Sequence, residues 1–260
     1  MKFDVTALKG GYGKHMVIHD VSFSVEKGQM TYVLGANGCG KTTLFKIIIG
    51  YKERMAGQIS VDGCDISKLT KREMAGIVAY IPQQHVPAFN YSVKDVVVMG
   101  RAAHLPPFGV PGKADFDLVD QSLNILGIEG LADIEYTRIS GGQQQLVLIA
   151  RAICQQAKMI VMDEPLQSLD FVNQDMVTRT LRKLVRKGYS IIISTHTAIH
   201  NYDKQDKALL MNKTGGAAFG DIEEILTKEA IARAYGMPIE TMMGEDGSGG
   251  KHLLCVPIHE

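Results

Sequence analysis

The residues best suited to chemistry form a glycine-rich segment, GANGCGKT, at 35–42, which has the spacing G-x-x-x-x-G-K-[ST]. Its glycines allow backbone N–H groups to turn inward around phosphate oxygens, and a helix that starts here adds partial positive charge. Lys41 can then reach the β and γ phosphates of a nucleotide, and Thr42 can bind Mg²⁺. A plain glycine turn is the alternative. The predicted nucleotide-binding residues are Gly35, Asn37, Gly38, Cys39, Gly40, Lys41, Thr42 and Thr43.

A second chemical pattern is MIVMDEP at 159–165, in which four apolar residues precede two acids. A buried strand that ends here places both acids at its carboxyl edge, where α/β sheets bind ligands. Asp163 can hold Mg²⁺ through water, and Glu164 can polarise an attacking water as a general base. Alone, the pattern also fits a solvated strand end, but the phosphate loop upstream favours the functional interpretation.

The elements that must position these residues alternate between strand and helix. A buried strand at 30–35 leads into the glycine-rich loop, and a helical pattern follows it. Strand patterns return at 158–163 and 189–195, with a helical pattern between them. The segment at about 85–155 is rich in proline and helical spacing, which indicates a helical insertion. Strands that alternate with helices imply a parallel sheet.

The two ends of the chain carry other patterns. Phe3, Val5 and Ala7 alternate with polar residues, which indicates a strand near the start. One helix is expected near 222–235. Near the end, HLLCVPI is expected to add an edge strand, and His252 and His259 are interpreted as surface residues because they lack metal-ligand spacing.

Size and charge exclude several classes of function. The chain has 260 residues, enough for one large domain or about one and a half. Its 28 basic residues balance 28 acidic ones, which argues against general nucleic-acid binding because that needs a basic footprint. No apolar run approaches the roughly 18 residues that cross a bilayer, and the start lacks a secretion signal. We therefore expect a cytosolic protein that reaches a membrane only through a partner.

The cysteines point to a reducing compartment. None of the four forms a CxxC pair, so a zinc knuckle or a thioredoxin-like site is not expected. Cys39, inside the phosphate loop, is interpreted as a small filler. The alternative is a thiol whose alkylation blocks nucleotide binding.

The segment ISGGQQQ at 139–145 resembles the LSGGQ signature of the ATP-binding subunits of ABC transporters. The resemblance covers about residues 3–240. Further family motifs occur in order along the chain, at Tyr12, Gln83, Leu169 with Asp170, and His196. Seven ordered motifs, with the phosphate loop and the two acids counted, are far more specific than the phosphate loop alone.

The resemblance implies an α/β fold. We expect a P-loop NTPase (RecA-like) core with an antiparallel β subdomain and an inserted α-helical subdomain at about 85–155. The ATP-binding domain is expected to span 1–240, and 241–260 is expected to be a C-terminal extension.

The resemblance also implies roles for individual residues. Ser140 and the glycines after it cap the γ phosphate of ATP bound to a second copy, so that two chains enclose two ATP molecules. Gln83 reaches Mg²⁺ and water, Tyr12 stacks on adenine, and His196 bonds to the γ phosphate. The expected catalytic residues are Glu164, His196, Gln83 and Lys41, the expected Mg²⁺ ligands are Thr42, Gln83 and Asp163, and the further nucleotide contacts are Tyr12, Ser140, Gly141, Gly142, Gln143 and Asp170.

One motif departs from the family pattern. The segment before Asp170 usually reads SALD with its aspartate, whereas this chain has Leu166-Gln167-Ser168-Leu169-Asp170. Leu166 and Gln167 are therefore unusual at positions that are expected to make contacts across the two copies.

The segment YSVKDVVVMGRAAH at 91–104 resembles the ATPases of importers for iron-siderophore, haem, cobalamin and molybdate or tungstate. The match includes Val93, Gly100 and Arg101, which the resemblance implies shape a groove for a short cytoplasmic helix of the permease. The expected partners are a second copy of the chain, membrane permease subunits and, indirectly, a substrate-binding protein, at the cytoplasmic face of the membrane. A soluble ABC ATPase of iron–sulfur cluster assembly is the alternative, and the SGGQ segment disfavours a P-loop kinase or GTPase.

Overall fold

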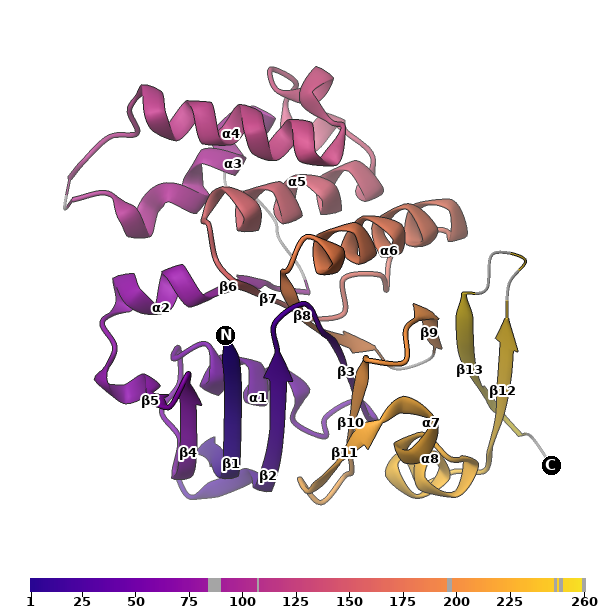
Figure 1. Ribbon diagram of the computed structural model, residues 1–260. Coiled ribbons are helices and arrows are strands. Elements are labelled where there is room, and N and C mark those ends of the chain that lie inside the picture. Colours follow the sequence, from indigo (N-terminus) through magenta and orange to yellow (C-terminus); the bar gives the residue numbers. More distant parts are fainter. Residues whose placement is uncertain (84–89, 107, 196–197, 246, 248–249, 259–260) are drawn as a thin grey trace.

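The computed structural model places a mainly parallel sheet at the centre, with a layer of helices on one side and an antiparallel sheet on the other (Figure 1). This arrangement confirms the predicted α/β class with an antiparallel β part and a helical insertion. The structure describes residues 1–83, 90–106, 108–195, 198–245, 247 and 250–258.

The central sheet has six strands in the order β11 (Ala217–Asp221), β10 (Lys207–Met211), β3 (Met30–Leu34), β8 (Ser190–Thr195), β7 (Met159–Met162) and β6 (Val78–Ile81). Neighbouring strands are parallel, except that β11 runs antiparallel to β10. Both β3 and β7 are buried along their whole length, as expected for parallel strands covered on both faces.

Alternating side chains of these strands enter two separate cores. Val33 and Val161 pack with α1 (Lys41–Ile48) and the antiparallel sheet. Side chains on the opposite face pack with α5 (Gly141–Cys154) and α6 (Phe171–Arg186). The central sheet therefore separates α1 from α5 and α6.

The antiparallel sheet has the order β2 (His15–Glu26), β1 (Lys2–Tyr12), β4 (Ala56–Val61) and β5 (Cys64–Asp65). The strand predicted at Phe3, Val5 and Ala7 is confirmed as β1; Phe3 and Val5 are buried, whereas Ala7 is only half-buried. The register shifts between Val5 and Leu8, Ala7 has a φ of +48°, and Leu8 takes the buried place. This bulge changes the phase of the strand, so simple alternation fails after Val5.

The helical layer consists of α3 (Val93–Val98), α4 (Lys113–Leu126) and α5, while α2 (Lys71–Ile77) leads into β6 (Figure 1). Short 3₁₀ turns occur at Ile66–Lys68, Met99–His104, Glu129–Leu131 and Tyr136–Arg138. A capping box formed by Thr70 and Glu73 lies at the start of α2, and one formed by Ser92 and Asp95 lies at the start of α3. In the described part of the chain, no helix has the length and apolar character that a bilayer crossing requires.

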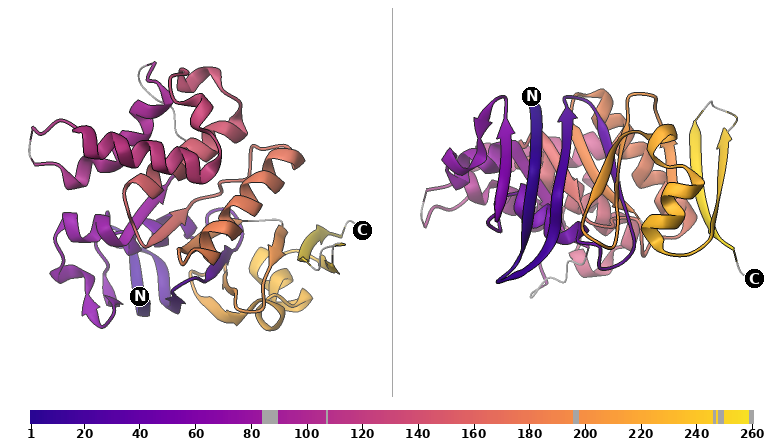
Figure 2. Two further views of the ribbon diagram at one scale, coloured as in Figure 1. Left: turned by 45° about the horizontal axis from the view of Figure 1, so that its top comes forward. Right: turned by 90° about the horizontal axis from the view of Figure 1, so that it is seen from below.

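The C-terminal region differs from the prediction in two ways. The single helix expected near 222–235 is two helices, α7 (Ile222–Ile225) and α8 (Lys228–Tyr235), because Thr227 caps the start of α8. A separate sheet has the order β12 (Ile239–Glu245), β13 (Lys251–Pro257) and β9 (Ala198–Tyr202). The expected edge strand, β13, is therefore the central strand of this sheet, at the end of the molecule away from the first strands (Figure 2).

His252 lies on β13 beside His200 of β9, with their Nδ1 atoms 3.5 Å apart. Burial, and next the neighbouring His252, lower the pKa of His200. His259 lies outside the described residues.

A buried ion pair fastens α6 to the central sheet. The Arg182 guanidinium lies 2.5 Å from the carboxylate of Asp206 and donates to the hydroxyl of Tyr32 at 2.8 Å. Arg182 is 3% exposed and Asp206 is 1% exposed. Asp206 also accepts from the backbone N–H of Met30 at 3.2 Å, so one carboxylate joins α6, β3 and the start of β10.

Asp206→Ala is expected to lower the free energy of unfolding by about 3–5 kcal/mol, because it removes the nearest carboxylate from a buried guanidinium. Urea unfolding followed by circular dichroism measures this loss. Asp203→Ala is the matched control, since Asp203 lies 3.6 Å from Arg182 but is 45% exposed, and it should cost about 1 kcal/mol or less. Equal losses in the two variants would contradict the role of the buried pair.

Candidate active site

The phosphate loop connects β3 to the start of α1. Gly40 immediately precedes α1 with a φ of +106°, a left-handed conformation that favours glycine. Among the described residues, no side chain caps α1, and its first turn contains no acid. The first N–H groups of α1 therefore remain available to an anion, which the helix dipole also favours.

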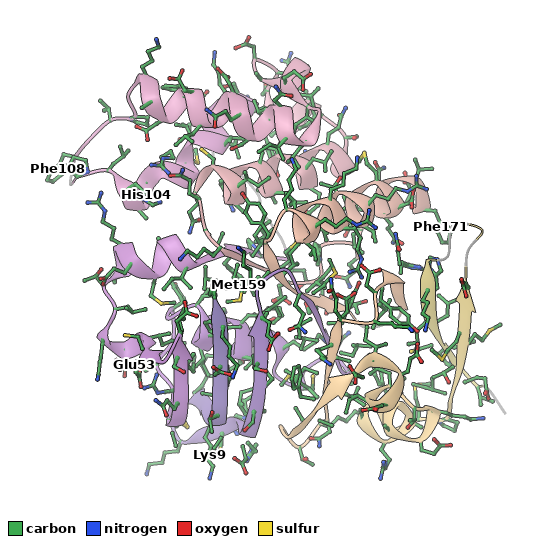
Figure 3. The ribbon with its side chains drawn as sticks, viewed as in Figure 1. Lys9, Glu53, His104, Phe108, Met159 and Phe171 are labelled. Carbon is green, nitrogen blue, oxygen red and sulfur yellow. The ribbon has the colours of Figure 1, made fainter. Side chains whose placement is uncertain are left out.

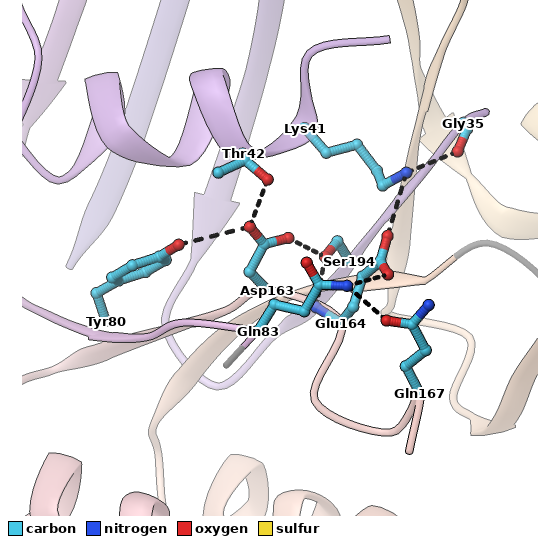
Figure 4. Close-up of polar contacts among 9 residues, drawn as sticks. All are labelled: Gly35, Lys41, Thr42, Tyr80, Gln83, Asp163, Glu164, Gln167 and Ser194. Carbon is cyan, nitrogen blue, oxygen red and sulfur yellow. Dashed lines mark hydrogen bonds and ion pairs between the residues drawn. The ribbon is translucent and has the colours of Figure 1, made fainter. Parts of the chain in front are cut away.

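Lys41 is directed across this loop toward the carboxyl edge of the sheet. Its side chain is 6% exposed, and its Nζ donates to the carbonyl of Gly35 at 2.8 Å. The same Nζ lies 3.5 Å from Oε1 of Glu164 (Figure 4). A buried ammonium held by one carbonyl and one carboxylate can exchange these partners for phosphate oxygens.

Asp163, directly after β7, is an acid with several hydrogen-bond donors around it. It is 3% exposed and accepts from Thr42 Oγ1 at 2.6 Å, Ser194 Oγ at 2.8 Å and the Tyr80 hydroxyl at 3.5 Å (Figure 4). Burial, and then the charge of Asp163, raise the pKa of Tyr80, so its hydroxyl stays protonated as a donor. These bonds compensate for the burial of the carboxylate.

Glu164 is held in an uncommon backbone conformation. Its φ is +47°, and its N–H donates to Ser194 Oγ at 2.8 Å. A left-handed conformation in a residue with a side chain costs free energy and persists where the surroundings enforce it. Here it directs the carboxylate between Lys41 and the Nε2 atom of Gln83, which donates to Glu164 Oε2 at 3.1 Å.

The oxygen ligands that Mg²⁺ prefers converge beside these groups. A cavity of about 440 Å³ is lined by Thr42, Gln83 and Asp163. A hydroxyl, an amide carbonyl and a carboxylate are hard oxygen donors, and Mg²⁺ keeps several waters besides such ligands. The residues present therefore fit Mg²⁺.

The signature segment lies elsewhere in the molecule. Ser140 caps α5 and forms a capping box with Gln143, on the face of the sheet opposite to α1. Gly141 is the first residue of α5. A Cβ on Gly142 would lie 2.1 Å from the side-chain oxygen of Asn173, so glycine at this position permits α5 to pack closely on α6. Asp170 caps α6 by accepting from the N–H of Asn173 at 2.8 Å.

The remaining predicted residues lie around the phosphate loop or on β1. Asn37 and Gly38 are exposed, whereas Thr43 is 7% exposed. Cys39 is 2% exposed, and burial raises the pKa of its thiol, which favours the filler interpretation over a reactive thiol.

Tyr12 is half exposed, and the ammonium of Lys52 lies 4.1 Å from the centre of its ring. One face of the ring is thus already occupied by a cation. His196 lies outside the described residues.

The structure brings Lys41, Thr42, Gln83, Asp163 and Glu164 together. It places Ser140, Gly141, Gly142 and Gln143 at the start of α5 and Asp170 at the start of α6. Sequence reasoning missed three contacts at the assembled part, made by Tyr80, Ser194 and Gln167. Tyr80 and Ser194 stand near the carboxyl ends of buried strands, which is the signal that could have identified them. Gln167 was visible only as a departure from a familiar pattern.

Comparison with known proteins supports a single family. The family model described as ABC transporter matches residues 18–167. An uncharacterized ABC transporter ATP-binding protein of Haemophilus influenzae is 39% identical, over 90% of this chain and 89% of its own length. The molybdate import ATP-binding protein MolC of the same organism is 34% identical, over 87% of this chain and 84% of its own length. A manganese transport system ATP-binding protein, MntB of Halalkalibacterium halodurans, is 34% identical over 90% and 92%.

Solved structures agree with this result. A chain described as part of a metal-chelate type ABC transporter in an inward-facing conformation has a TM-score of 0.83 and 32% identity, covering 99% of this chain and 98% of its own. An ATP-binding cassette of an ABC transporter in its ADP conformation has a TM-score of 0.75 and 24% identity, covering 92% of this chain and 96% of its own. At this identity the likeness supports the fold alone.

Lys41→Ala is expected to weaken binding of a nucleoside triphosphate by at least about tenfold, because charged hydrogen bonds to phosphate are lost. Fluorescence titration with a labelled nucleotide measures the affinity. Lys183→Ala, at an exposed lysine on the last turn of α6, is the matched control and should leave the affinity unchanged. Unaltered affinity in Lys41→Ala would refute the assignment of the phosphate loop.

Proposed function

Because the chain belongs to the ABC transporter family as an ATP-binding subunit, we propose that it powers the import of a metal ion, a metal chelate or molybdate through a membrane permease. The observation that carries this proposal is the convergence of Lys41, Thr42, Gln83, Asp163 and Glu164 at one edge of the central sheet. The chain is an ATPase coupled to import, and ATP is its nucleotide.

The site performs hydrolysis by exchanging hydrogen-bond partners. The N–H groups at the start of α1 and the ammonium of Lys41 bind the β and γ phosphates. When Lys41 turns from Glu164 to phosphate, the carboxylate is free to accept a proton from the attacking water. Mg²⁺, held by Thr42, Gln83 and Asp163, supplies charge neutralisation on the phosphates when bound. His196 is proposed to bond to the γ phosphate.

A second copy is needed to complete the nucleotide site in this proposal. Ser140 and Gln143 begin α5, on the face of the sheet opposite to α1, so they do not enclose the nucleotide bound by their own chain. Next to Asp170, Phe171 is 87% exposed and points outward from the start of α6 (Figure 3). An exposed signature and an exposed apolar side chain support a sandwich of two chains and two ATP molecules, with Tyr12 at the adenine.

The permease is proposed to bind a groove between α1 and α2. This groove of about 840 Å³ combines an apolar floor, including Ile59 and Met74, with Lys52, Arg54 and Lys71. A short amphipathic helix fits such a surface. Placement of the chain at the cytoplasmic face of the membrane, as a peripheral subunit, follows from this contact.

The residues given for the lining of this groove lie outside 91–104, so the role that the resemblance implied for that segment stays a prediction. Arg101 is 9% exposed and bonds to Asp115 at 2.9 Å and to the carbonyl of Cys154 at 3.1 Å. Arg101 therefore joins the helices of the helical layer, and in this proposal it acts on the permease through the shape of that layer.

The substrate class rests on the relatives. Proteins named for molybdate import and manganese transport are 34% identical to this chain over most of its length, and one named for iron chelatin transport is 31% identical. All three are transport proteins, which supports import over the iron–sulfur alternative. The proposed partners are a second copy, permease subunits and, indirectly, a substrate-binding protein.

Glu164→Gln is expected to bind ATP but to slow hydrolysis by about 10²–10⁴-fold, because it removes the general base. Because the γ phosphate is not cleaved, the variant should then accumulate as a dimer, which size-exclusion chromatography in the presence of ATP detects. Adding Ser140→Arg should abolish this dimer and leave ATP binding by each chain intact, since the arginine obstructs the partner's phosphate. A monomer at saturating ATP in Glu164→Gln would count against the sandwich.

Import is tested by reconstituting the chain in lipid vesicles with the permease that co-purifies with it. Labelled manganese, an iron chelate or molybdate should accumulate only with ATP, and Lys41→Ala should abolish accumulation. Co-purification with soluble iron–sulfur assembly proteins, and no membrane protein, would favour the alternative instead.

A further inference from the structure

Gln167 lies in the loop between β7 and α6, where the chain departs from the family pattern. Its N–H donates to the carbonyl of Glu164 at 3.3 Å, which closes a four-residue turn with Pro165 in second place. The side chains of the first and last residues of this turn both meet Gln83.

The same loop is fixed to the helix that follows it. The side-chain amide of Gln174, on α6, donates to the carbonyls of Leu166 and Leu169 at 3.1 and 3.0 Å. The position of Gln167 is thereby set by backbone contacts, even though its side chain is exposed.

The Gln83 amide has a defined orientation in this network. Its Nε2 donates to Glu164 Oε2 at 3.1 Å and to Gln167 Oε1 at 2.5 Å (Figure 4). A carboxylate only accepts hydrogen bonds, so the atom of Gln83 that faces Glu164 is nitrogen. Both hydrogens of that nitrogen are then used, one by each partner.

This orientation decides what Gln83 offers to a cation. With nitrogen toward Glu164 and Gln167, the carbonyl oxygen turns toward Asp163 (Figure 4). Only this oxygen can bind Mg²⁺, because the flipped amide would present N–H groups to the cation.

We propose that Gln167 is a positioning residue that keeps the carbonyl oxygen of Gln83 directed at the Mg²⁺ site. The inference rests on the proposed function. During hydrolysis Glu164 must also accept a hydrogen bond from the attacking water, which competes with its bond to Gln83. Gln167 has no such second task, so it retains the amide orientation when Glu164 is engaged.

The test compares Gln167→Met, which is close in shape but lacks the acceptor oxygen, with Gln167→Glu, which keeps an acceptor. Mn²⁺ is the probe, titrated with a non-hydrolysable ATP analogue and followed by electron paramagnetic resonance. Gln167→Met should weaken Mn²⁺ binding by about threefold to tenfold, the effect of one lost hydrogen bond. Gln167→Glu should recover all or part of the affinity, and nucleotide affinity without divalent cation should not change in Gln167→Met.

A double-variant experiment separates positioning from a general effect. In a Gln83→Ala background, Gln167→Met should cause no further loss of Mn²⁺ affinity, because there is no amide left to orient. Gln121→Met, at an exposed glutamine of α4, is the matched control and should behave like the unmodified chain.

Two results would overturn the inference: unchanged Mn²⁺ affinity in Gln167→Met, or an equal loss with and without Gln83. Failure of the proposed function looks different, since the unmodified chain would then show no ATP hydrolysis that depends on a divalent cation.

Discussion

The buried carboxylate of Asp163 is the group on which the geometry of the site depends. A carboxylate that is 3% exposed requires donors, and it takes them from Thr42 on α1, Ser194 on β8 and Tyr80 on β6. These donors arrive together only when β6, β7, β8 and β3 pair in this order. Sheet topology and the proposed cation site therefore depend on each other, because an altered strand order would leave the acid buried without these donors.

The central sheet also divides the tasks of the chain. On one face, the start of α1 has no side-chain cap among the described residues, and on the other, Ser140 caps the start of α5 and is exposed. In the proposed sandwich, a single chain therefore contributes two half-sites that face different directions. In the proposed sandwich this separation makes ATP binding and association of the two copies a single event, since neither half encloses the phosphates alone.

Patterns that are local in the sequence predicted the fold class and the placement of Lys41, Asp163 and Glu164 near one another. The glycine spacing and the apolar strand before two acids each act within a few residues, so they can be interpreted without the rest of the chain. Long-range pairing could not be predicted in the same way. The bulge at Ala7 depends on a partner strand, and β13 is central because β9, fifty residues earlier in the chain, pairs with it.

The hydrogen bonds of Gln167 show the same limit at the site. The sequence shows that glutamine is unusual at this position. Its hydrogen-bond partner Gln83, however, lies 84 positions away in the sequence, so no local spacing rule could predict the contact. The three residues 166, 167 and 169 sit in a loop whose shape is set by α6, and α6 is itself fastened through Arg182 to the sheet.

The central place of β13 has a consequence for handling the protein. Its hydrogen-bonding groups serve β12 on one side and β9 on the other. Proteolytic loss of β13 would remove the strand that both β12 and β9 pair with, and would leave their edges unpaired next to exposed Met242 and Met243. The cleaved protein would self-associate through these edges during storage. The presence of β13 should therefore be verified in each preparation.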